Sequence, residues 1–207
     1  DGKYSYAVGK YGGGIPISWE SLVNDDLDAF SELPTQLGLA GRRTEERFAT
    51  DLYAGPPGPD TTFFSTANKN VINPTVLPST ALTNPPLSIA ALQVAMTVIG
   101  NQVDSDGAPI YINSVVLMVP PALEVTANNI INSTEILAAS GGGDGTGNDQ
   151  LRVTNWMRNR VRAVVNPWLP IISTTNGNTS WYLFADPSVG RPAMEVGFLI
   201  SNPTPDL

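Results

Sequence analysis

Apolar residues recur at helical spacing over residues 24–54, the longest such pattern in the chain. Asn24 is a suitable N-cap, and apolar side chains follow at helical intervals from Leu27 to Leu52. Pro34 lies inside the pattern and should kink or restart the helix, because its ring removes one intrahelical hydrogen bond. We therefore predict a long, kinked, surface-lying helix, ended by the Gly- and Pro-rich run that follows it.

Two short segments precede this helix. Residues 1–14 alternate loosely between apolar and polar side chains and end in consecutive glycines, which predicts a strand and a flexible joint. Residues 14–23 are predicted to be a second extended piece.

The middle of the chain changes from loop to alternating helix and strand patterns. Residues 60–86 are rich in Pro and Asn and are predicted to be loop. The elements predicted after them are a helix over 87–99 started by Pro86 or capped by Ser88, a turn over 102–109, a buried strand over 110–121 and a helix over 121–139.

The last third of the chain is predicted to be mostly strand. The Gly-rich segment 140–149 has the composition of a mobile loop, and strands are predicted over 157–165, 181–186 and 194–200. The elements together indicate an α+β fold with a central antiparallel or mixed sheet flanked by helices.

The aromatic segment 181–186 is predicted to be structural. Its side chains are apolar on both faces of the strand, which is typical of a strand in the interior of a sheet. Trp168, in the preceding connection, can pack on that sheet, and burial of each ring stabilises the fold by about 2–3 kcal/mol. The predicted core residues are Trp168, Trp181, Leu183 and Phe184.

Composition narrows the possible chemistry. The 207 residues include no Cys and no His, which excludes disulfides, thiol nucleophiles, haem ligation, the usual zinc sites and a Ser-His-Asp triad. The side chains that remain available for catalysis are carboxylates, Lys, Tyr, Ser and Thr. We predict no cofactor, no metal and no catalytic residue.

The charge balance disfavours a general nucleic-acid binder. Lys and Arg number 11 against 19 Asp and Glu, a net charge of -8, whereas phosphate neutralisation needs clustered cations. Charged residues make up only 14% of the chain. A surface with so few charges is suited to contact with neighbouring subunits, although a loop-rich β protein would have the same composition. No apolar run is long enough to span a membrane.

Three local motifs have simpler structural interpretations. The sequence Asp-Ser-Asp-Gly at 104–107 begins like a calcium loop but lacks the later ligands, so we interpret it as a turn. The sequence at 141–147 lacks the Lys-Ser/Thr of a phosphate-binding loop and is interpreted as a flexible loop. The candidate paired carboxylates of a hydrolase all have a helix-dipole or ion-pair explanation: Asp25, Asp26, Glu45 and Glu46.

Arg158, Arg160 and Arg162 alternate within a predicted strand and should therefore point to one face. A row of salt bridges between subunits and a solvated face are equally compatible with this pattern, and DNA contact is less favoured.

Three segments, 17–55 (ISWESLVNDDLDAFSELPTQLGLAGRRTEERFATDLYAG), 104–131 (DSDGAPIYINSVVLMVPPALEVTANNII) and 164–199 (VVNPWLPIISTTNGNTSWYLFADPSVGRPAMEVGFL), occur in this order and cover about half the chain. Together they resemble the major capsid proteins of tailed bacteriophages, especially the Mu-like head subunit and protease–capsid fusion branch. The fold that this resemblance implies is the Hong Kong 97 type.

The resemblance also implies a domain organisation. Residues 1–14 would be the remnant of an extended-loop strand, residues 15–55 part of a peripheral domain with a spine helix, and residues 56–207 an axial domain. The amino-terminal arm and the carboxyl-terminal peripheral strands of the family are not recognised, so we expect the chain to be a fragment or processed product.

The function implied is structural, without enzymatic activity. Copies would form hexamers and pentamers of an icosahedral head, assembled in the bacterial host cytoplasm with scaffolding or portal proteins, and would enclose double-stranded DNA without binding it specifically. We predict the subunit contacts at Arg42, Arg43, Glu46, Arg47, Arg158, Arg160 and Arg162. The alternatives are an encapsulin-like compartment, a carboxylate-dependent hydrolase and, less favoured because of the long helix, an adhesin-like β module.

Overall fold

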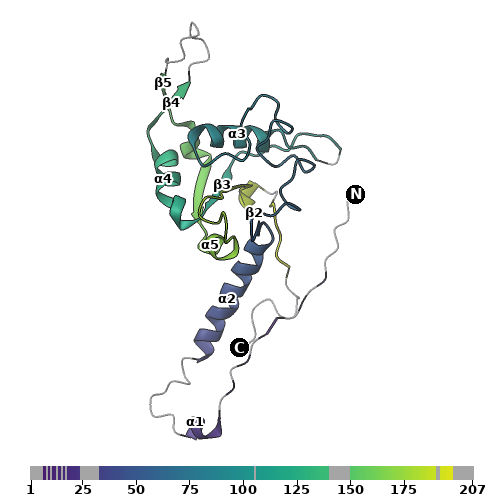
Figure 1. Ribbon diagram of the computed structural model, residues 1–207, viewed down its shortest axis with the longest axis vertical. Coiled ribbons are helices and arrows are strands. Elements are labelled where there is room, and N and C mark those ends of the chain that lie inside the picture. The colour runs from purple at the N-terminus through teal and green to yellow at the C-terminus, as the bar shows by residue number, and fades with distance from the viewer. Residues whose placement is uncertain are drawn as a thin grey trace. The chain divides into compact units, whose positions relative to one another are not determined.

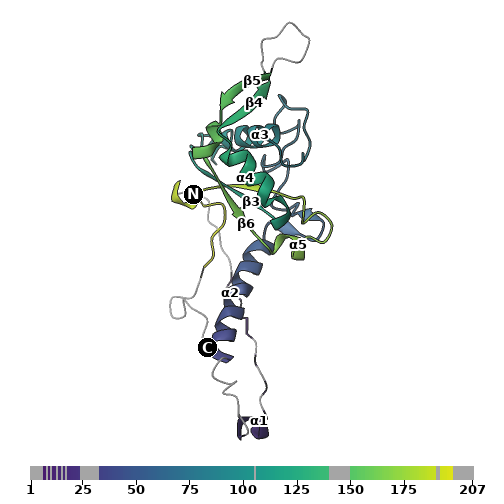
Figure 2. The ribbon, with the colours of Figure 1, turned by 90° about the vertical axis from the view of Figure 1, so that its left-hand side faces the viewer.

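The computed structural model describes residues 33–104, 106–139, 150–189 and 192–197, together with residues 7, 9, 11, 12, 14, 16 and 18–23. The chain divides into two units, one comprising Asp1–Ala49 and Glu195–Leu207 and the other Thr50–Met194. In the second unit, helices gather around one three-stranded sheet (Figure 1, Figure 2).

Helix α1 spans Trp19–Val23. The extended structure predicted for residues 14–23 is therefore wrong for its last five residues. Glu20 lies in the first turn of α1, where a carboxylate interacts favourably with the positive end of the helix dipole.

Helix α2 spans Leu33–Asp51, which confirms the predicted helix over that range; residues 24–32 lie outside the described residues. Pro34 is in the first turn of α2, where its missing N–H breaks no intrahelical hydrogen bond. Farther along the helix, the Phe48 ring lies 5.6 Å from the Tyr11 ring.

A three-stranded sheet forms the centre of the second unit. Its strands are β3 (Val115–Val119), β6 (Val161–Val165) and β7 (Tyr182–Ala185), in the order β6-β3-β7. Strand β3 runs parallel to β6 and antiparallel to β7, so the sheet is mixed. Four of the five β3 residues are buried, because β3 is paired on both edges and covered on both faces.

The two faces of β3 contribute to two hydrophobic cores. One core contains Val115, Leu117 and Val119 of β3 with Leu92 and Met96. The other contains Tyr53, Ala54, Leu169, Tyr182 and Phe184, and Met118 packs against it. The alternation along β3 follows from the period of two residues in a strand.

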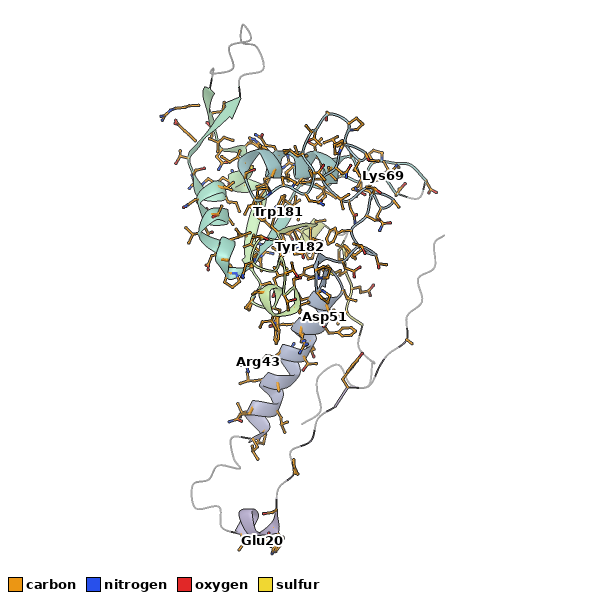
Figure 3. The ribbon with its side chains drawn as sticks, in the orientation of Figure 1. Glu20, Arg43, Asp51, Lys69, Trp181 and Tyr182 are labelled. Atoms are coloured by element: carbon orange, nitrogen blue, oxygen red, sulfur yellow. The ribbon has the colours of Figure 1, made fainter. Side chains whose placement is uncertain are left out.

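The position of β7 in the sheet differs from the prediction. Among the described residues β7 pairs only with β3 and is an edge strand, not an interior one. It is apolar on both faces because one core covers each face: Trp181 and Leu183 pack against the first core, and Tyr182 and Phe184 belong to the second. Figure 3 labels Trp181 and Tyr182.

Helix α3 spans Ile89–Gly100 and confirms the helix predicted over residues 87–99. Ser88 is its N-cap, and the Ser88 hydroxyl accepts a hydrogen bond from the Ala91 N–H at 3.2 Å. The turn predicted over 102–109 is also present, closed by a bridge between Val103 and Pro109.

The helix predicted over residues 121–139 is too long. A 3-10 turn η2 (Pro121–Leu123) leads into helix α4 (Glu124–Asn132), and strand β4 (Glu135–Ala139) then pairs with β5 (Gln150–Thr154). The Asn155 side-chain amide ends α4, since it donates to the main-chain oxygens of Ile130 and Ile131 at 2.7 and 3.1 Å. The loop predicted over 140–149 lies outside the described residues.

Short elements complete the second unit. Strands β1 (Ala54–Gly55) and β2 (Gly58–Pro59) form a tight hairpin, helix α5 spans Leu169–Ile172, and the 3-10 turn η4 spans Pro187–Val189. The strand predicted over 110–121 is confined to β3. Residues 194–197 of the predicted last strand have no strand structure, and residues 198–200 lie outside the described residues.

Candidate assembly surface

The three arginines predicted to form one row do not share a strand. Arg158 lies in the 3-10 helix η3 (Trp156–Asn159), Arg160 caps that helix, and only Arg162 is in β6. The helix starts here because the Asn155 carboxamide oxygen accepts a hydrogen bond from the Met157 N–H at 3.1 Å. The predicted alternation is therefore wrong, although all three arginines are exposed.

Arg160 is held against an aromatic ring. Its guanidinium carbon lies 5.9 Å from the centre of the Trp156 ring, and its Nε donates to the Asn113 main-chain oxygen at 3.3 Å. A second contact, at 3.5 Å, reaches the oxygen of Ile112. These contacts fix the orientation of the guanidinium and leave it exposed, so it can bind a further acceptor.

Two large aromatic side chains are exposed in the segments that contact Arg160. Trp156 exposes 39% of its surface, and Tyr111, which precedes Ile112, exposes 82%. We refer to Tyr111, Trp156, Arg158 and Arg160 as the arginine–aromatic patch. Trp, Tyr and Arg are the residue types that most often supply the binding energy of protein interfaces.

The sequence pattern does not single out Trp156 and Tyr111. Trp156 is four residues before Arg160, so its only signal in the sequence is an aromatic residue close to arginine. Tyr111 has no such signal, because the neighbouring residues Ile112 and Asn113 are brought to Arg160 by the pairing of β3 with β6.

Arg162 makes a different contact from the other two arginines. Its Nε lies 3.9 Å from Asp186, which follows β7. The pKa of Asp186 is held below its ordinary value, mainly by the hydrogen bond from the Ser188 N–H and less by Arg162. Arg162 and Asp186 therefore connect the two outer strands across β3 as an ion pair between an exposed arginine and a half-buried carboxylate, and at 3.9 Å this pair contributes little to stability.

The second predicted contact surface lies on α2. Arg42, Arg43, Glu46 and Arg47 are all exposed, and Arg43 projects from the side of the helix in Figure 3. Arg42 lies 3.4 Å from Glu45, one turn along the helix. An exposed helix pair of this kind stabilises the helix by only a few tenths of a kcal/mol, roughly 0.3.

The predicted core residues occupy different environments. Phe184 is buried, and Trp181 and Leu183 are partly buried against the first core. The indole N–H of Trp181 donates to the Pro85 oxygen at 3.0 Å. Trp168 is half-buried at the start of α5, where its main-chain N–H donates to the side-chain oxygen of Asn166 at 2.9 Å.

A cavity of about 970 Å³ lies beside β7. Its lining includes Phe63, Phe64, Val98, Ile99 and the run Trp181–Ala185, and no charged residue lines it. A hydrolase would need converging carboxylates, at least one of them with a raised pKa. Among the described carboxylates, only Asp60 and Asp186 have shifted pKa values, and both pKa values are lowered, in each case chiefly by backbone hydrogen bonds.

The described residues were searched for metal-binding groups and for membrane-spanning helices. Among them, no group of three or more acidic side chains is arranged to hold a metal ion. In the same part of the chain, no helix combines the length and apolar character needed to cross a membrane. Asp25 and Asp26 lie outside the described residues.

The chain was compared with curated proteins, solved structures and protein families. No curated protein and no solved structure matches the chain. A family model described as phage capsid protein matches residues 3–207, nearly the whole of the chain. The chain therefore belongs to the phage capsid protein family.

Proposed function

We propose that this capsid protein is the shell-forming subunit of an icosahedral phage head. The observation that carries the proposal is the match of the phage capsid family over residues 3–207. Copies would close into hexamers and pentamers around double-stranded DNA, with the Hong Kong 97-type fold, and scaffolding or portal proteins would assist assembly.

The exposed surface supports this proposal. The arginine–aromatic patch presents an oriented guanidinium over the exposed Trp156 ring, with the exposed Tyr111 in the segment that contacts Arg160, and the chain supplies an excess of carboxylates for contact with this patch on a neighbouring copy. The exposed charged side chains of α2 would form a second contact. Each contact is modest by itself, and repetition around a closed shell makes the sum large.

The charge of the chain is consistent with enclosed DNA. A net charge of -8 disfavours tight phosphate binding, which would allow packaged DNA to move without binding to the inner surface of the shell.

In the domain organisation that we propose, residues 15–55 belong to a peripheral domain and residues 56–207 to an axial domain, preceded by the remnant of an extended loop over 1–14.

Electron microscopy of the purified full-length protein tests the proposal. We expect capsomers or hollow shells that appear in negative stain as protein concentration rises, with a matching increase in mass by sedimentation velocity. A protein that stays monomeric over the whole concentration range, with and without the scaffolding partner, would contradict the proposal. Shells that retain a cargo protein and exclude DNA would indicate a compartment of the encapsulin kind.

A further inference from the structure

Helix α1 presents an apolar face to solvent. Trp19 exposes 74% of its surface and Val23 exposes 63%, and residues four positions apart lie on the same face of a helix. Of the four tryptophans in the chain, Trp19 is the most exposed. Because an isolated helix of five residues is marginal in water, a partner that covers Trp19 and Val23 would stabilise α1.

The cavity beside β7 has the size and the lining to receive an indole ring. Pockets that hold a drug-sized molecule enclose roughly 300–1,000 Å³, and this cavity encloses about 970 Å³. No charged residue lines it, and Pro192 and Ala193 are already part of its wall. Five aromatic side chains line it: Phe63, Phe64, Trp181, Tyr182 and Phe184. Rings of this kind can contact an indole ring edge to face or offset, which stabilises a complex beyond the effect of the area buried.

A cation lies at the rim of the cavity. Gln102 lines the cavity, and its side-chain amide donates a hydrogen bond to the main-chain oxygen of Lys69, which is exposed. The side-chain oxygen of Gln102 can accept the N–H of an indole ring. In α1, the exposed Glu20 directly follows Trp19 (Figure 3 labels Lys69 and Glu20). With Trp19 inside the cavity, the Glu20 carboxylate can stay hydrated and pair with the Lys69 ammonium group.

Two carboxylates also adjoin lining residues, and both are already engaged. Asp60 accepts hydrogen bonds from two main-chain N–H groups, at 2.8 and 3.0 Å. Asp186 accepts one main-chain N–H, at 2.9 Å, and lies 3.9 Å from Arg162. In the part of the chain that the structure describes, Lys69 forms no ion pair, so its charge is available to Glu20.

We propose that the cavity beside β7 is a docking site for α1 of a second copy of this chain, with Trp19 as the anchor inside the cavity and Glu20 beside Lys69. The inference rests on the proposed function, because shell subunits meet as copies. A tryptophan that fills a desolvated pocket is a frequent source of binding energy in protein interfaces. The two copies contribute different surfaces, so the contact is heterologous and can continue around a ring of subunits.

Cross-linking between introduced cysteines tests the contact, because the chain has no Cys of its own. Glu20→Cys and Lys69→Cys are prepared as separate full-length proteins, mixed and treated with a short bismaleimide. A link between these two cysteines joins two copies, and mass spectrometry of the linked peptides identifies it. The control mixture pairs Glu20→Cys with Arg152→Cys, at an exposed position on β5. We expect a yield at least about tenfold higher with Lys69→Cys. Equal yields would overturn the inference.

A double variant excludes insertion of α1 into the cavity of its own chain. The protein that carries both Glu20→Cys and Lys69→Cys is treated with the same bismaleimide at a dilution where it is monomeric. We expect no link within one chain. A link within the monomer would show that α1 fills the cavity of its own chain, which overturns the inference.

Removal of the anchor should weaken association of the full chain. We expect Trp19→Ala to weaken it by about tenfold or more in sedimentation velocity, and Trp19→Phe, which keeps a ring, to weaken it less. Because Trp19 is exposed, thermal unfolding of both variants should match that of the parent protein. Association that Trp19→Ala leaves unchanged would overturn the inference, while the self-association itself would still support the proposed function.

A synthetic peptide with the sequence of residues 15–26 separates the inference from the proposed function. Thr61 is exposed and lines the cavity, so Thr61→Cys gives the full chain a single thiol there. In excess over the dilute Thr61→Cys protein, the peptide should slow alkylation of this thiol by iodoacetamide, and the same peptide with Trp19→Ala should not. Equal alkylation rates with the two peptides would overturn the docking site, whether or not the chain self-associates.

Discussion

The side-chain amide of Asn166 lies 2.9 Å from the Thr50 hydroxyl, although the two residues are 116 positions apart. The same amide donates to the Tyr53 hydroxyl at 2.9 Å. Its carboxamide oxygen accepts the N–H of Trp168 at 2.9 Å. Asn166 thus fastens the segment that ends α2 to the connection between β6 and α5.

Replacement of Asn166 should destabilise the second unit. Asn166→Ala leaves the partly buried Thr50 and Tyr53 hydroxyls without this donor, and we expect a loss of about 2–3 kcal/mol in the free energy of unfolding. Urea titration measures the loss. Asn178→Ala, at an exposed position with no such contacts, is the control and should change stability by less than about 0.5 kcal/mol. Equal losses would contradict the role of Asn166.

Removal of the Tyr182 hydroxyl should stabilise the protein. The hydroxyl is buried and makes no hydrogen bond of good geometry to a described residue; the nearby side chains of Ser180 and Ser173 only partly offset the effect of burial on its pKa. The ring contacts of Tyr182, including its 4.9 Å separation from the Tyr53 ring, do not depend on the hydroxyl. We therefore expect Tyr182→Phe to raise the free energy of unfolding by about 1 kcal/mol. A clear decrease would show that the hydroxyl has a partner in solution.

The same residue predicts a dependence of stability on alkaline pH. Burial raises the pKa of Tyr182 to about 12, from an unfolded value of 10.0. The unfolded chain therefore loses this proton first, and stability falls by up to about 1.4 kcal/mol per pH unit between the two pKa values. Burial also raises the pKa of Tyr53, which acts in the same direction.

Denaturant unfolding at several pH values isolates the contribution of Tyr182. We expect the slope of stability against pH to be shallower in Tyr182→Phe than in the parent protein above pH of about 10. Parallel curves for the two proteins would argue against a buried, neutral Tyr182.

Gly177 fills a space that admits no side chain. A Cβ at this position would lie 2.5 Å from the Leu169 oxygen and 2.6 Å from the Pro170 Cα, and closer still to the Ser173 oxygen. The backbone must move to accept it, so Gly177→Ala should cost about 2–4 kcal/mol. Gly100→Ala is the control, because a Cβ there has no neighbour within 4 Å. Thermal unfolding should show a large loss for Gly177→Ala alone.

The arginine–aromatic patch predicts a defect in assembly rather than in folding. Arg160→Ala removes the oriented guanidinium, and we expect association to weaken by about tenfold or more. Arg152→Ala removes an arginine from the exposed ion pair with Glu135 and should associate normally. Sedimentation velocity measures both variants, and thermal unfolding should show each to be folded. A loss of association in both variants alike would point to net charge as the cause.

The sequence predicted several elements correctly because their signals are local. The Ser88 cap and helical spacing marked α3, and a short run of side chains apolar on both faces marked β7. For the candidate site, the pattern identified Arg158, Arg160 and Arg162 as exposed cations but placed them on one strand. It missed Trp156, which lies four residues before Arg160, and Tyr111, whose segment is brought to Arg160 by the pairing of β3 with β6.

What the sequence by itself determined about this protein is the class of fold, the absence of Cys and His chemistry, and the family to which the chain belongs. Only the tertiary structure decided where the elements end and which described strands pair with one another. The carboxamide of Asn155 ends α4 and starts η3, and two separate cores make β7 apolar on both faces although, among the described strands, it pairs only with β3. A periodic pattern records which faces of a segment are buried, but the partner that buries them, or pairs with an edge, is chosen by residues far away in the chain.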